Sequence, residues 1–287
     1  MNSDNGPGLL RRQLGGILRQ MRVAMKLTLE DVAEQLTTST ARLSRIENGS
    51  SNATLRMPEL NTLLALYGIT DQAKIDDLQQ MFRGTQKRDW WAGYEPVMPA
   101  GYSTILGLET DATAERVWEP HLIPGLLQTR AYAHAVMTVG KLARGGGEIG
   151  PLVDLRLERQ QFLTRESRPL YLWAVIGEAA LRNNIGGEAV MREQIRHLIS
   201  SAEMPNVKIQ VVPLASGVHP GIGGPFTLLE AAAFPTVTYI ETSEGTIYLE
   251  KTEDVQRYDE AYRELCTIAL DLKASLTYLH DLTKESR

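Results

Sequence analysis

Between Ser39 and Gly49 the chain carries hydroxyl, amide and guanidinium groups at helical spacing. An arginine can bond both acceptors of guanine in the major groove, and a small apolar side chain can contact a thymine methyl group. Hydroxyl, amide and further arginine groups suit phosphate oxygens, which fix position without reading sequence. The segment therefore predicts a helix that binds double-stranded DNA. The expected base contacts are Thr40, Ala41 and Arg42, and the other expected contacts are Ser39, Ser44, Arg45 and Asn48.

Three helices are needed to position this segment. Apolar residues at helical spacing predict a first helix that includes Leu14 and Leu18. Thr28 and Asp31 form a capping-box pattern that begins a short second helix, and this places Thr28 among the expected DNA contacts. Hydroxyl residues then interrupt the pattern before a third helix, which Gly49 ends. This order is that of a helix-turn-helix, in which the third helix enters the major groove.

The runs 27–33 and 43–49, Leu-Thr-Leu-Glu-Asp-Val-Ala and Leu-Ser-Arg-Ile-Glu-Asn-Gly, resemble the Cro/repressor or XRE family of helix-turn-helix proteins. The resemblance covers about Leu14–Gly68 and implies a five-helix domain that binds an operator as a homodimer. Leu29 stands where the family often has a glutamine that contacts DNA. The polar segment Ser50–Arg56 is longer than usual, and it makes Arg56 a further candidate. A domain of this shape that serves only protein contacts is the alternative.

Charge divides the chain into two parts. Residues 1–88 hold 12 Lys and Arg against 9 Asp and Glu, a net charge of +3, which leaves 18 against 26, a net charge of −8, for the remainder. This asymmetry fits a small module that faces phosphate and a larger acidic module. We expect a DNA-binding domain at 1–86, a Trp-, Gly- and Pro-rich connector at 87–100, and a regulatory, dimerisation and partner- or ligand-binding domain at 101–287.

The larger domain begins with helical patterns and continues with short segments rich in Val, Ile, Tyr and Thr. The fold class is therefore expected to be α+β, with a five-helix N-terminal domain followed by helices and a mostly antiparallel sheet. A long final helix is expected over Val255–Leu282. The predicted strands are Leu170–Ile176, Val207–Pro213, Phe226–Glu230, Val237–Glu241 and Thr246–Leu249.

The larger domain also resembles a family, the C-terminal domain of actinobacterial WhiJ-like regulators. The resemblance rests on the run Glu119–Thr129 and on shorter runs at 178–181, 211–213 and 217–221. It implies an antitoxin-like regulator that a small protein encoded nearby counteracts. A small-molecule effector is the other expectation, because a ligand that binds two states of a regulator differently shifts its DNA affinity.

Five polar residues stand in or beside apolar segments of this part of the chain. Buried polar groups are usually paired or gathered at a site, so these residues are candidates for ligand or partner binding. The alternative is internal ion pairs between Arg159 and an acid, together with a backbone cap from the glutamine. The candidates are Glu109, Gln128, Arg159, Glu178 and His219.

No pattern in the sequence indicates catalysis, a cofactor or a metal. The histidines lack metal-binding spacing, and Cys266 lies in an apolar helical pattern that is typical of a core thiol. Met1–Gly8 has no apolar signal core and no run approaches a membrane span, so a cytoplasmic protein without membrane contact is expected. Two alternatives to a DNA-binding regulator remain. One is an antitoxin-like interaction protein, and the other is a hydrolase fused to a DNA-binding domain, with carboxylates such as Glu178 and Glu241 paired across the sheet.

Overall fold

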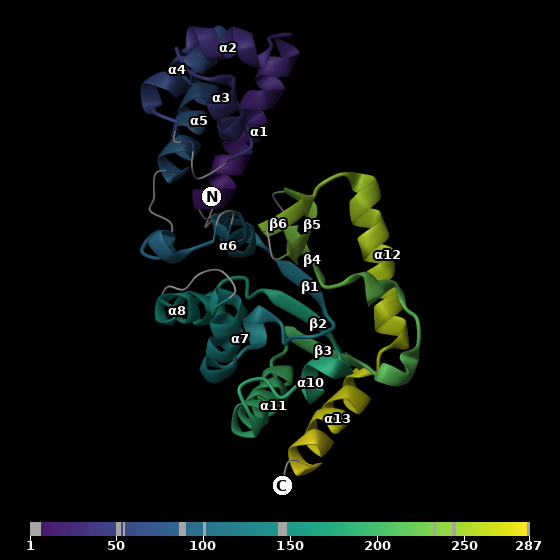
Figure 1. Ribbon diagram of the computed structural model, residues 1–287. Helices are drawn as coiled ribbons and strands as arrows, with labels where there is room; N and C mark the ends of the chain where they lie inside the picture. The colour runs from purple at the N-terminus through teal and green to yellow at the C-terminus, as the bar shows by residue number, and fades with distance from the viewer. Residues whose placement is uncertain are drawn as a thin grey trace. The chain divides into compact units, whose positions relative to one another are not determined.

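The computed structural model (Figure 1) describes residues 7–49, 53, 55–85, 90–99, 102–142, 148–231, 234–242 and 245–285. The chain forms two compact units. Met1–Gly93 and Ser103–Asp111 make the N-terminal unit, and Tyr94–Tyr102 and Ala112–Arg287 make the C-terminal unit. Parts of the predicted connector (87–89 and 100) and of the polar segment (50–52 and 54) lie outside the described residues.

Helices build the described part of the N-terminal unit. They are α1 (Pro7–Ala24), α2 (Leu29–Gln35), α3 (Thr40–Glu47), α4 (Met57–Leu66), α5 (Gln72–Thr85) and α6 (Tyr102–Asp111). The apolar faces of α1 to α5 meet in one core, in which Leu18, Leu43 and Leu60 are fully buried. Sequence periodicity predicts α1 to α5 and misses α6. Ile105 to Glu109 of α6 are all buried, and a helix buried on every side shows no amphipathic period.

The C-terminal unit contains a six-stranded sheet in the order β3-β2-β1-β4-β5-β6. Its strands are β1 (Ala114–Glu119), β2 (Tyr171–Gly177), β3 (Val207–Val212), β4 (Phe226–Ala231), β5 (Phe234–Thr242) and β6 (Gly245–Leu249). β1 pairs with β2 and β2 with β3 in parallel, and the other pairs are antiparallel. The α+β class is confirmed, with a mixed sheet. The predicted strands omit the central β1, because its six residues, Ala-Glu-Arg-Val-Trp-Glu, include three charged side chains and do not alternate between apolar and polar.

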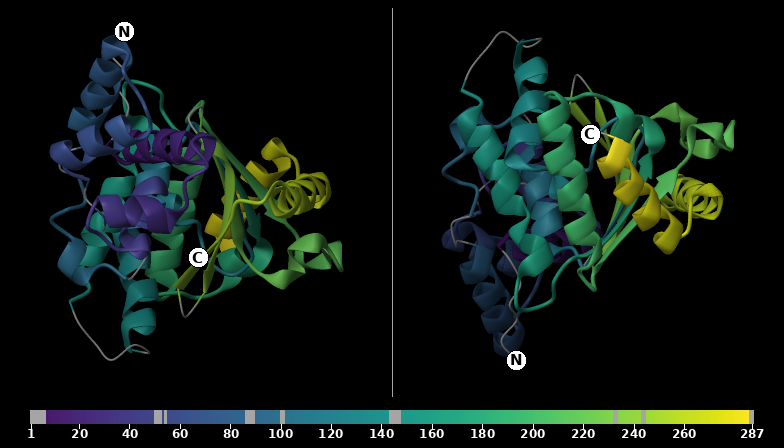
Figure 2. Two further views of the ribbon diagram at one scale, coloured as in Figure 1. Left: turned by 90° about the horizontal axis from the view of Figure 1, so that it is seen from above. Right: turned by 90° about the horizontal axis from the view of Figure 1, so that it is seen from below.

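Helices cover both faces of this sheet. Seven helices lie in the described part of the unit: α7 (Arg130–Leu142), α8 (Gly150–Arg159), α9 (Gln161–Thr164), α10 (Glu178–Arg182), α11 (Glu188–Ala202), α12 (Thr252–Ile268) and α13 (Leu272–Glu285). α12 lies on one face, while α7, α8 and α11 lie on the other (Figure 2). On the α12 side, Trp118, Phe226 and Tyr262 form a buried core.

The prediction of one helix over Val255–Leu282 is wrong, because the helix is interrupted between the end of α12 and the start of α13. The amide of Leu270 donates to the carbonyl of Val211 at 2.8 Å, and Gln210 Nε2 donates to the carbonyl of Leu270 at 2.9 Å. Asp271 then accepts a hydrogen bond from the amide of Ala274 at 2.7 Å, which begins α13. Contacts with β3 therefore interrupt a continuous helical pattern.

Candidate nucleic-acid interface

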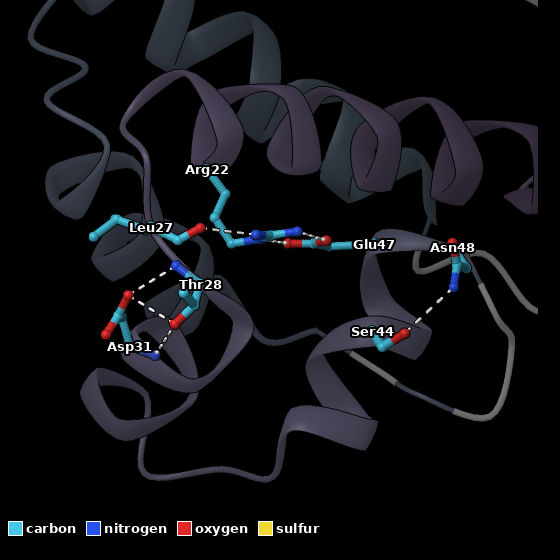
Figure 3. Close-up of polar contacts among 7 residues, drawn as sticks. All are labelled: Arg22, Leu27, Thr28, Asp31, Ser44, Glu47 and Asn48. Carbon is cyan, nitrogen blue, oxygen red and sulfur yellow. Dashed lines mark hydrogen bonds and ion pairs between the residues drawn. The ribbon is translucent and has the colours of Figure 1, made fainter.

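Local hydrogen bonds fix where α2 and α3 begin. The hydroxyl of Thr28 accepts from the amide of Asp31 at 3.1 Å, and the Asp31 carboxylate accepts from the amide of Thr28 at 2.8 Å (Figure 3). The hydrogen bonds that the amide and the hydroxyl of Thr28 donate to the Asp31 carboxylate lower the pKa of Asp31. The hydroxyl of Ser39 accepts from the amide of Arg42 at 3.2 Å and so begins α3. The predicted capping box at Thr28 is confirmed, and the two caps set the turn between the helices.

A buried ion pair holds the C-terminal end of α3 against α1. Arg22 Nε and Nη2 donate to the two carboxylate oxygens of Glu47 at 2.6 and 2.9 Å, and Nη1 donates to the carbonyl of Leu27 at 2.9 Å (Figure 3). The hydrogen bond to Glu47 raises the pKa of Arg22. Glu47 is buried, and a bidentate pair fixes direction as well as distance. Arg22 and Glu47 therefore orient α3.

Two glycines, Gly15 and Gly49, allow the backbone of α1 to lie close to the end of α3. A Cβ atom on Gly15 of α1 would lie 2.4 Å from the carbonyl oxygen of Ile46 and 2.6 Å from that of Glu47. Gly49 ends α3 with a φ of +68°, and a Cβ atom there would lie 2.6 Å from the Cα of Arg12. The backbones of α1 and the end of α3 are thus nearly in contact, which only glycine allows.

A second ion pair holds the other end of α3 against α4. Arg42 Nη1 and Nη2 donate to the two oxygens of Glu59, both at 3.0 Å, and Arg56 Nη2 donates to Oε1 at 2.9 Å. Burial opposes ionisation of Glu59, but the hydrogen bonds from Arg42 and Arg56 outweigh it and lower its pKa to about 2. Glu59 is therefore a charged link between α3 and α4 at neutral pH.

One side of α3 and of its C-cap is open to solvent, and we call it the α3 face: Ala41, Ser44, Arg45 and Asn48. Ala41, Arg45 and Asn48 are exposed and Ser44 is half-buried. Arg45 Nε donates to the carbonyl of Ala41 at 3.1 Å. Asn48 Nδ2 is 3.5 Å from the hydroxyl of Ser44 (Figure 3). The guanidinium group of Arg45 thus lies along an open helix surface, at one helical turn from Ala41.

The structure separates the two arginines that the sequence places together. Arg42 is expected on the open side of α3, but in the structure its guanidinium group forms an ion pair with Glu59. A base contact by Arg42 would require this pair to break, and that contact stays a prediction. Ser39 and Thr28 are exposed and Thr40 is half-buried. Leu29 packs against the domain core, and Arg56 is exposed beside Glu59.

Replacing Glu59 by glutamine is expected to lower the free energy of unfolding of the N-terminal unit at pH 7 by about 2–3 kcal/mol. The folded-state pKa of about 2 lies below the ordinary value of 4.5. The stabilisation is therefore complete above pH 4.5 and is lost as the pH falls towards 2. Amide hydrogen exchange in α3 and α4, measured between pH 7 and pH 3, tests this, with Asp77→Asn on the exposed side of α5 as control. Equal acid sensitivity of Glu59→Gln and the wild type would contradict it.

The structure places the five candidates of the larger domain in different surroundings. Glu109 is fully buried in α6 of the N-terminal unit. Gln128 Nε2 donates to the carbonyl of Ile123 at 2.7 Å, and Gln128 Oε1 accepts from Arg156 at 2.8 Å. Arg159 is buried and bonded to the hydroxyl of Tyr102. Their role as ligand contacts stays a prediction.

The other two candidates hold loops in place. Glu178 accepts from the amide of Leu214 at 2.9 Å, from Arg182 Nε at 2.6 Å and from the hydroxyl of Tyr278 at 2.7 Å. These bonds lower the pKa of Glu178, the one from Leu214 most of all. His219 packs edge-on against Trp118, with ring centroids 5.4 Å apart.

One acidic residue of the C-terminal unit is unusual and is missed by the sequence patterns. Glu119 ends β1, and burial together with the negative charge of Glu241 raises its pKa to about 8, although Arg156 acts in the opposite direction. Glu241 lies on β5 and Arg156 on α8, both distant in sequence from Glu119. Only the fold brings these three charges near one another, so no local pattern marks them.

A groove of about 350 Å³ lies in the C-terminal unit among α10, α11 and α13. This volume is at the lower end of the range for small-molecule sites. None of the five candidates lines it. Its apolar wall is Leu181, Met191, Ile195 and Leu282, and its polar residues are Arg182, Asn183, Asn184 and Glu188.

Among the described residues, no three His, Cys, Asp or Glu side chains lie close enough together to hold a metal ion. No helix of the described ranges is long and apolar enough to cross a bilayer.

Comparison with known proteins finds two family matches. Residues 13–78 match a helix-turn-helix domain, which is the region that carries the two ion pairs and the α3 face. Residues 102–281, more than half of the chain, match a domain of unknown function (DUF5753). Neither the curated proteins nor the solved structures provide a significant match. The chain therefore belongs to the DUF5753 family and carries an N-terminal helix-turn-helix domain.

Proposed function

We propose that this chain is a transcriptional regulator of the XRE type that reads a double-stranded DNA operator with the α3 face. The proposal rests on the observation that the polar side chains of α3 fall into two groups, one bonded to other helices and one exposed. Arg42 and Glu47 are bonded to other helices, whereas Arg45 and Asn48 are exposed on one side. A helix that is braced at both ends and polar on its open side meets the requirements for docking in a major groove.

In this proposal Arg45 contacts the DNA, whereas Arg42 holds α3 against α4 through its ion pair with Glu59. Arg45 is exposed and one turn from Ala41, so the two side chains would face neighbouring base pairs, with Asn48 and Ser39 nearer the phosphates. Breaking the Arg42–Glu59 pair to free Arg42 would leave the buried Glu59 without one of its two arginines. That cost favours Arg45 as the DNA contact.

Replacing Arg45 by alanine is expected to weaken binding to the preferred operator by about 10- to 100-fold, since one good arginine–base contact is worth about 1–3 kcal/mol. The operator is first selected from a random duplex library with the wild-type protein, and affinity is then measured by fluorescence anisotropy at two salt concentrations. Arg83→Ala, at an exposed arginine near the end of α5, is the control and should bind as the wild type does.

Thermal unfolding, measured beside operator affinity, separates the roles of the two arginines. Arg42→Ala should lower the melting temperature of the N-terminal unit, whereas Arg45→Ala should leave it unchanged, because only Arg42 is bonded to a buried acid. Operator affinity that is unchanged in a folded Arg45→Ala variant would overturn the assignment of the α3 face. A loss of sequence preference in Arg42→Ala with unchanged stability would instead favour Arg42 as the base contact.

We also propose that the protein acts without catalysis, as a homodimer whose DNA affinity is set through the C-terminal domain. The resemblance to WhiJ-like, antitoxin-like regulators supports a small protein or a small molecule as the controlling partner. The groove among α10, α11 and α13 offers a place for a small molecule, because apolar side chains form one wall and amides and charges border it.

A further inference from the structure

Three large apolar side chains are exposed within nine residues of the chain, at 214–222, in the connection between β3 and β4. Leu214 is 66%, Val218 90% and Ile222 73% exposed. We call residues 213–225 the apolar loop. Other large apolar side chains exposed in the described part of the C-terminal unit are separated along the chain, as Val139 and Ile247 are. A group of such side chains on a surface commonly marks a contact with another macromolecule.

The apolar loop is held firmly to the domain. The indole Nε1 of Trp118 donates to the carbonyl of Gly221 at 2.9 Å, and a Cβ atom on Gly221 would lie 2.5 Å from that nitrogen. His219 packs on the same ring, and the amide of Leu214 donates to Glu178. Both views of Figure 2 show the loop, in light green, at the outside of the unit near α12. Its apolar side chains are thus displayed by an anchored segment.

Charge favours a second copy of the chain as the occupant. Residues 209–229 contain no Asp, Glu, Lys or Arg, the longest such stretch in the sequence, whereas residues 89–287 carry 18 basic and 26 acidic side chains, a net charge of −8. Two such acidic domains repel each other, so the contact that is least opposed lies at the uncharged segment. A basic partner would instead be drawn to the acidic surface.

We propose that the apolar loop forms the centre of the interface between two copies of this chain. The inference rests on the proposed function, because a helix-turn-helix reads paired half-sites when two copies are joined. Three side chains are fewer than a stable interface of about 800 Å² per partner requires. The apolar loop therefore supplies the dry centre, and the neighbouring polar surface supplies the rim.

Sedimentation equilibrium of the full-length protein tests the interface. The wild type is expected to be a dimer, and Val218→Asp with Ile222→Asp should raise the dissociation constant of the dimer at least tenfold. Val139→Asp is the matched control, because Val139 is 71% exposed on α7, outside the apolar loop. The control should dimerise as the wild type does, and circular dichroism should show equal melting temperatures for all three proteins.

DNA binding separates this inference from the proposed function. On a duplex with two half-sites the Val218→Asp, Ile222→Asp variant should lose at least tenfold in affinity, and on a duplex with one half-site it should bind as the wild type does. A monomeric wild type, or a charged variant that dimerises normally, would overturn the interface and leave the proposed function standing. A dimeric wild type without operator affinity would contradict the proposed function alone.

Discussion

Replacing Gly15 by alanine is expected to destabilise the N-terminal unit by about 2–3 kcal/mol, which is typical of overpacking a tight contact. The same substitution is expected to abolish operator binding. The added Cβ would lie 2.4 and 2.6 Å from two carbonyl oxygens at the end of α3. Backbone atoms cannot rotate away, so α1 and α3 must separate. The Arg22–Glu47 pair spans the same two helices and would lengthen with them.

The neighbouring glycine provides the control for this substitution. A Cβ atom on Gly16 would meet nothing within 4 Å. Alanine is favoured over glycine inside a helix by about 1 kcal/mol, so Gly16→Ala should stabilise the same unit. Hydrogen exchange of α1 and α3 in the full-length variants reports on this unit without interference from the other. Equal protection in the Gly15→Ala and Gly16→Ala variants would contradict the close approach of α1 and α3.

Replacing Glu119 by glutamine is expected to stabilise the C-terminal unit at pH 8 by about 2–4 kcal/mol and to have little effect at pH 4. The folded-state pKa of Glu119 is about 8, against an ordinary value of 4.5. Between these values the folded protein keeps a proton that the unfolded chain has lost, so stability falls as the pH rises. Glutamine has the shape of the protonated acid and removes this dependence.

Thermal unfolding of the wild type and of Glu119→Gln between pH 4 and pH 8 measures the effect. The two melting curves should converge at the acidic end and diverge towards pH 8. Glu260→Gln is the control, because Glu260 is an exposed glutamate on α12. Parallel pH profiles for the wild type and Glu119→Gln would show that Glu119 is ionised in the folded protein at neutral pH.

The N-terminal unit was largely predictable because its signals are local. The caps at Thr28 and Ser39 and the stop at Gly49 act within a few residues of the helices that they begin or end. The bracing pairs were not predictable. Arg22 and Glu47 are 25 positions apart, and Arg42 and Glu59 are 17. No local rule links residues at such separations, so Arg42 was expected on the open side of α3.

In the C-terminal unit, tertiary contacts decide what local sequence patterns do not. Strands rich in branched residues, such as β2 and β3, were predicted, but the central β1 contains two glutamates and an arginine. Arg116 finds partners in Glu230 and Asp259 across the sheet and on α12, so the charge is satisfied by tertiary contacts. For the same reason the five polar candidates, four of which lie in this unit, could be recognised as unusual but not assigned to a common site.

The arrangement on α3 also bears on how such a regulator changes its target during evolution. The residues that support the helix, Arg42 and Glu47, are distinct from those on the α3 face. Exchanging Ala41, Ser44, Arg45 or Asn48 therefore leaves these supporting contacts intact, and under the proposed function a duplicated gene can acquire a new operator through a few surface changes. The same separation makes this domain a convenient starting point for engineering altered DNA specificity.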